Sequence, residues 1–154
     1  MSFVYSAVFD NTAVSTATDI FESTTVATDR PVYVWALDVF QDSDLGDAAE
    51  EVIHIGLYRA ATAGSTGTAV TEVAYVTADA PTATLAVNQL RGTASTGGTL
   101  IHAIGWNIRI PTLWCPPPEM RPKFAADEDP FTFRMIVAPI DSIDLSATQI
   151  WEEV

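Results

Sequence analysis

The stretch Leu100–Ile110 (LIHAIGWNIRI) decides the fold class, because most of its large apolar residues recur at every second position and share one face with His102. Successive side chains of a β-strand point to opposite faces, so a period of two is typical of a strand with one face in a core. Phe131–Val137 (FTFRMIV) has the same period. Together the two runs predict an antiparallel sheet with one buried face.

Further strand signals lie on both sides of these two runs. Pro31–Phe40 is apolar on both faces for most of its length and is expected to be a central strand buried on both sides. The other expected strands span residues 4–9, 19–22, 51–59, 69–77, 82–87 and 148–154. Only Asp44–Glu51 could form a turn or two of helix. With about eight to ten strands, the sequence predicts an all-β fold, an antiparallel β-sandwich with long irregular loops and, as its expected topology, a jelly roll.

Length and charge limit the function. The 154 residues fit one domain, residues 1–154, and the net charge is −13. Nucleic acid and anionic membranes bind cationic surfaces, so neither is expected as a partner. There is no apolar run long enough to cross a membrane and no basic leader segment, so we expect synthesis in the cytoplasm. Cys115 is the only cysteine, which excludes an intrachain disulfide and a multi-cysteine metal site. Lys123 is the only lysine.

The residues expected to carry catalysis are few. His54 and His102 are the only histidines, and both lie in strand-like runs without the short spacing of a metal pair. We therefore expect them to be core or edge residues. Cys115 precedes three prolines, and no helix follows it whose N-terminus could activate a thiolate. The sequence predicts no enzyme, no catalytic residue and no cofactor.

Clustered carboxylates offer one candidate cation site. Asp42–Glu51 (DSDLGDAAEE) is acidic, but Gly46 and Asp47 do not fit the spacing of an EF-hand loop. We expect a solvated acidic loop, and whether it binds a cation stays open. Asp127–Asp129 is a shorter and weaker cluster.

Three segments are expected to be loops. Ala61–Thr68 and Gly92–Gly98 consist of small uncharged residues and are expected to be flexible. Pro111–Pro130 is longer, and Trp114–Pro122 within it is expected to run as polyproline II. A rigid arm with apolar ends docks at a low entropic cost, so we predict an interface there. The candidate interface residues are Trp114, Pro116, Pro117, Pro118 and Met120.

The four tryptophans allow other interpretations than an interface at the proline-rich segment. Trp114 could instead cover the end of its own sandwich. Trp35, Trp106 and Trp151 could stack on sugars, but their positions in strands are more simply explained as core or inter-sheet positions.

Several short motifs along nearly the whole chain carry a resemblance to a known group of proteins. They are Val4–Phe9, Asp19–Glu22, Gln41–Glu50, Pro118–Pro122, Pro139–Thr148 and Trp151–Glu153. The chain resembles small proteins of tailed phages and prophages, although its Trp114–Pro118 run is denser in proline than is usual there. The resemblance implies a jelly-roll or sandwich component of the virion that decorates or cements the capsid exterior. It implies the major capsid protein as partner and a homotrimer as the assembly, and it brings no catalytic residues.

Physical considerations agree with a structural role. A high negative charge keeps free subunits apart, and a jelly roll is expected to protect its strand edges. The alternative is a receptor- or glycan-binding module of a tail fibre or spike, which needs an exposed pocket with polar and aromatic residues. A small hydrolase is a third class, which the residue inventory favours least.

Overall fold

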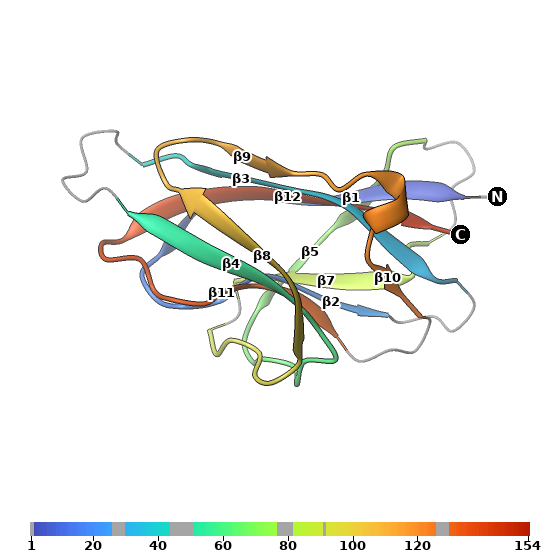
Figure 1. The fold of residues 1–154 in the computed structure, drawn as a ribbon, viewed down its shortest axis with the longest axis horizontal. Helices are drawn as coiled ribbons and strands as arrows, with labels where there is room; N and C mark the ends of the chain where they lie inside the picture. The colour runs from blue at the N-terminus through green and yellow to red at the C-terminus, as the bar shows by residue number, and fades with distance from the viewer. Residues whose placement is uncertain (1, 26–29, 44–50, 77–81, 91, 126–129) are drawn as a thin grey trace.

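The computed structural model describes residues 2–25, 30–43, 51–76, 82–90, 92–125 and 130–154. Two antiparallel sheets pack face to face (Figure 1), so the predicted all-β antiparallel sandwich is confirmed. The helical content of the described residues is one 3-10 turn, η1 (Pro118–Met120). The described part of the chain holds no helix of the length and apolarity that a membrane crossing requires.

Within the described residues, each sheet has six strands. In sheet A the order is β10 (Lys123–Phe124), β3 (Val32–Gln41), β12 (Ile143–Glu153), β1 (Phe3–Val14) and β6 (Glu72–Ala74), with β9 (Thr112–Trp114) also paired with β3. In sheet B the order is β5 (Thr68–Val70), β7 (Leu85–Gln89), β2 (Asp19–Thr25), β11 (Phe131–Met135), β4 (Val52–Arg59) and β8 (Thr99–Asn107).

Four antiparallel pairs of strands organise the two sheets. β1 pairs with β12 and β2 with β11, while β3 pairs with β9 and β4 with β8. The segment that contains β5, β6 and β7 extends both sheets at one side, because β6 joins β1 and β7 joins β2. The chain therefore runs back and forth between the sheets, and its first and last strands meet at the centre of sheet A.

The core lies between the sheets and follows the period of two. In β1, Tyr5, Ala7 and Phe9 are buried, whereas Val8 between them is 54% exposed. The Tyr5 ring stacks on Trp151 of β12 with centroids 5.8 Å apart. The core positions expected for Trp106 and Trp151 are confirmed, since both side chains are fully buried.

Strand β3 is less buried on its outer face than the sequence predicts. It was expected to be buried on both faces, and its inward side chains are buried, including Val34 and Val39. Its outward side chains are half-buried instead, among them Trp35, which the sequence placed in the core. The reason is that β3 has neighbours on both sides within sheet A, but no described element covers the outer face of that sheet in front of it.

The proline-rich segment is also more regular than expected. Trp114 belongs to strand β9, and Pro118 begins the turn η1, so the expectation of a continuous polyproline II arm is wrong. Pro117, with φ −59° and ψ 155°, keeps that conformation just before the turn. Proline suits the first position of a helical turn, because the N–H it lacks would have no intrahelical partner there.

Candidate functional site

The residues with catalytic potential, His54, His102 and Cys115, lie on the surface. His54 on β4 and His102 on β8 are both exposed, so neither is a core residue, and only His102 lies on an edge strand. Cys115 is an exposed free thiol. Among the described residues, no group of three or more His, Cys, Asp or Glu side chains could hold a metal ion.

The candidate cation loop is only partly described. Residues 44–50 of Asp42–Glu51 lie outside the described residues, as do residues 127–129. At its ends, Asp42 contacts the Ser146 hydroxyl, and both Glu51 carboxylate oxygens accept a hydrogen bond from the Ile140 amide at 3.0 and 3.1 Å. Both described carboxylates therefore bond to this chain's own groups.

The five interface candidates do not share one surface. Trp114 is half-buried and points to the core, with its ring centroid 5.7 Å from that of Phe133 and 5.1 Å from that of His102. Pro116 is buried, whereas Pro117, Pro118 and Met120 are exposed. The geometry of Trp114 matches the alternative in which it covers its own sandwich.

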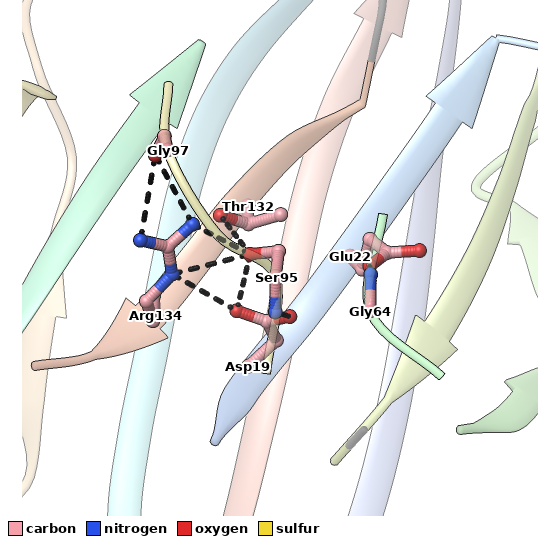
Figure 2. A network of polar contacts seen from close by, with 7 residues as sticks. All are labelled: Asp19, Glu22, Gly64, Ser95, Gly97, Thr132 and Arg134. Atoms are coloured by element: carbon pink, nitrogen blue, oxygen red, sulfur yellow. Dashed lines mark hydrogen bonds and ion pairs between the residues drawn. The ribbon is translucent and has the colours of Figure 1, made fainter. Parts of the chain in front are cut away.

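Sequence reasoning missed a buried polar network on the outer face of sheet B (Figure 2). The Asp19 carboxylate is fully buried and accepts hydrogen bonds from the amide and the hydroxyl of Ser95 at 2.6 and 2.8 Å. Arg134 Nε lies 3.5 Å from Asp19 and also donates to the Ser95 hydroxyl, while its guanidinium stacks on Tyr58. Thr132 completes the network with a 3.2 Å contact to Ser95.

A second buried acid, Glu22, holds the neighbouring loop. Its carboxylate accepts a 2.6 Å hydrogen bond from the Gly64 amide. The two loops that were expected to be flexible are joined to one another by the bridges Thr62–Thr96 and Ser65–Thr93. Two buried carboxylates on β2 hold these loops over sheet B, so the loops have long-range anchors that the expectation of flexibility did not include. The signal in the sequence was the acidic pair within an otherwise strand-like run, Asp19–Glu22.

A third buried acid lies near the end of β12. Glu153 accepts hydrogen bonds from the Thr84 amide at 2.6 Å and from Trp151 Nε1 at 3.0 Å, and it forms a 3.0 Å ion pair with Arg30. Burial raises the pKa of the adjacent Tyr5 phenol above its usual 10.0, and the negative charge of Glu153 raises it further. All three buried acids therefore bond to other groups of this chain and hold its segments together.

The outer face of sheet A carries a candidate binding geometry. Val4, Trp35, Tyr75 and Ile150 line a shallow pocket of about 380 Å³. Trp35 Nε1 donates a 3.0 Å hydrogen bond to Glu152, which orients the indole.

Exposed apolar side chains continue this pocket along the sheet. Val8 and Val73 are 54% and 53% exposed, and Tyr75 is 60% exposed. We call the set Val4, Val8, Trp35, Val73, Tyr75 and Ile150 the apolar face. Contiguous apolar surface on a soluble protein typically marks a site of interaction with another molecule.

Charges of both signs lie beside the apolar face. Arg121 lies 4.2 Å from the centroid of the Trp35 ring, and Lys123 lies 5.4 Å from that of Tyr33. Glu152 and the half-buried Asp38 supply two negative charges on the same side of sheet A, and Asp10 lies beside Val8 and Val73 in a neighbouring pocket of about 420 Å³. The apolar face itself contains no charged side chain, on a chain whose net charge is −13.

Comparisons with known proteins do not assign the chain to a class, so its class is inferred from the fold and the surface described above. No protein-family model matches the chain, and neither a curated protein nor a solved structure is found to be similar to it.

Proposed function

We propose that the chain is a non-catalytic structural protein of a tailed-phage virion, which decorates or cements the capsid shell by binding the major capsid protein. The observation that carries this proposal is the apolar face, a set of exposed and half-buried uncharged side chains on a strongly acidic chain. Burying such a face against a partner gains apolar contact without desolvating many charges, as in the centre of protein–protein interfaces. The motifs that resemble phage virion proteins supply the choice of partner.

We further propose that the sandwich is a jelly roll. Its support is the nested pairing of β1 with β12, β2 with β11, β3 with β9 and β4 with β8. Such pairing is that of a long antiparallel ribbon folded over into two sheets, which is how a jelly roll arises from two Greek keys. In this description β5, β6 and β7 are an insertion between the two strands of the innermost pair.

The proposal is tested on purified phage particles from the source of this sequence. Quantitative mass spectrometry is expected to find the chain in hundreds of copies per particle, and particles stripped of the protein are expected to bind it again. The variant Tyr75→Ser removes an exposed ring at the centre of the apolar face and is expected to weaken rebinding at least tenfold, which corresponds to about 1.4 kcal/mol. Ile140→Ser is the matched control, because Ile140 is 72% exposed but lies outside the apolar face.

Three results would overturn the proposal. A handful of copies per particle would place the chain in the tail, and equal rebinding of the two variants would remove the apolar face as the attachment surface. Absence from particles would exclude a virion role altogether.

The pocket on the apolar face favours a second candidate function. Trp35 and Tyr75 are the kind of aromatic side chains on which sugar rings stack, and Glu152 and Arg121 lie next to the indole. A receptor- or glycan-binding module would therefore use the same pocket. Binding to a glycan array that is lost in Trp35→Ala, together with a low copy number, would support this candidate over capsid decoration.

A further inference from the structure

The edges of the two sheets differ in how they are protected. β5 and β6 have three residues each and β10 has two, while the three-residue β9 lies between Pro111 and Pro116. Short edge strands and flanking prolines are common ways to prevent edge-to-edge association. β8, at the other edge of sheet B, is nine residues long, and within the described part of the chain it pairs with β4 alone.

β8 also lacks the charges that protect exposed edges. Its sequence TLIHAIGWN contains no Asp, Glu, Lys, Arg or Pro. All side chains from Thr99 to Ala103 are exposed, with Leu100 at 47% and Ile101 at 38%. One protective device is present, a bulge at Ile101 that interrupts the register with β4, and the ladder is regular again from His102 to Asn107. The expectation of protected edges thus fails at β8.

We propose that β8 of one copy pairs antiparallel with β8 of a second copy, so that two six-stranded sheets become one. On an edge strand, half of the backbone N–H and C=O groups point away from the sheet, and a second strand satisfies them. The contact is two-fold, because the same strand is used on both sides. It gives pairs of copies, in contrast to the trimer that the resemblance implies, and it stands independently of the capsid proposal.

The net charge of the chain favours a second copy as the partner of β8. Two chains of net charge −13 repel one another, so they associate best along a segment free of acidic residues, and β8 is such a segment. The partner must also offer an extended, unpaired and uncharged strand, and another β8 has all three properties. Pairing centred on the middle residue, Ala103, gives the longest overlap and places Ala103 opposite its own copy.

Charge reversal at Ala103 tests the pairing. The wild-type chain is expected to sediment as a pair at micromolar concentration, and the amides of β8 are expected to gain protection from hydrogen exchange as the concentration rises. Ala103→Glu and Ala103→Lys each place like charges opposite one another, so each is expected to weaken pairing at least tenfold. An equimolar mixture of the two variants is expected to restore it, because Glu then faces Lys.

Ala69→Glu is the matched control. Ala69 is also exposed and lies on the opposite edge of sheet B, in β5, so this variant is expected to pair like the wild type. A wild-type chain that stays single up to several hundred micromolar overturns the proposal. An assembly that survives in Ala103→Glu, or a mixture that stays single, does the same. None of these outcomes depends on particle binding, so failure here is distinguishable from failure of the capsid proposal.

Discussion

Replacing Asp19 by alanine removes the acceptor that holds loop 92–98 over sheet B. The carboxylate is fully buried and receives two hydrogen bonds from Ser95 in addition to its ion pair with Arg134. In Asp19→Ala the Ser95 amide and the Arg134 guanidinium lose a charged partner in a place that water reaches poorly. We expect the variant to be less stable and its loop to open more often.

The size of the loss follows from these contacts. Removing one member of a buried ion pair costs about 3–5 kcal/mol. Losing Asp19 costs Arg134 less than it would cost a fully buried cation, because the Arg134 side chain is 14% exposed, stacks on Tyr58 and contacts the Gly97 carbonyl. We therefore expect the lower end, about 3 kcal/mol, which for a chain of this length lowers the melting temperature by about 6–12 °C.

Urea unfolding followed by tryptophan fluorescence measures the stability, and hydrogen exchange at the Ser95 amide measures loop opening. Asp141→Ala is the control, because Asp141 is exposed and a surface change of this kind stays within about 0.5 kcal/mol. If Asp19→Ala lowers the free energy of unfolding by less than about 1 kcal/mol and the Ser95 amide stays protected, the network does not hold the loop in place and the reasoning is refuted.

Two further predictions concern single side chains. Trp114→Ala removes the contact with Phe133 and is expected to destabilise the isolated chain by about 2–3 kcal/mol in urea unfolding; an unchanged midpoint with weaker particle binding would instead restore Trp114 as an interface residue. Because the pKa of Tyr5 is raised above 10.0, the folded chain keeps this proton where the unfolded chain loses it, so stability falls as the pH rises past about 10. Tyr5→Phe is expected to reduce that fall between about pH 9 and 11, and an identical alkaline profile would contradict the raised pKa.

The fold class could be predicted because burial in a sandwich follows the alternation of side chains along each strand. Phe131, Phe133 and Met135 are buried as the period of two requires. Alternation cannot tell which of two apolar faces another layer will cover, however. Trp35 was therefore expected in the core, whereas it lies half-buried on the outer face of sheet A.

The error at the prolines and the missed anchors of the loops have separate physical causes. Proline removes only its own N–H, so Thr112–Trp114, which precedes the proline run, keeps the amides that pair with β3. Loop sequences rich in small residues were interpreted as flexible because nothing local holds them. Their anchors, Asp19 and Glu22, come from β2, far away in the sequence. Such long-range contacts leave no periodic signal.

The position of β12 has a consequence for the order in which the chain folds. β12 lies between β1 and β3, so sheet A has no continuous ladder until residues 143–153 have been added. Partner strands that are so far apart in the sequence meet only after a large loop has closed, and proteins dominated by such contacts fold slowly. We therefore expect folding to be completed late, with β1 and β3 left without the strand that joins them in one sheet. During that interval the acidic character of the whole chain, more than any finished edge, keeps nascent copies apart.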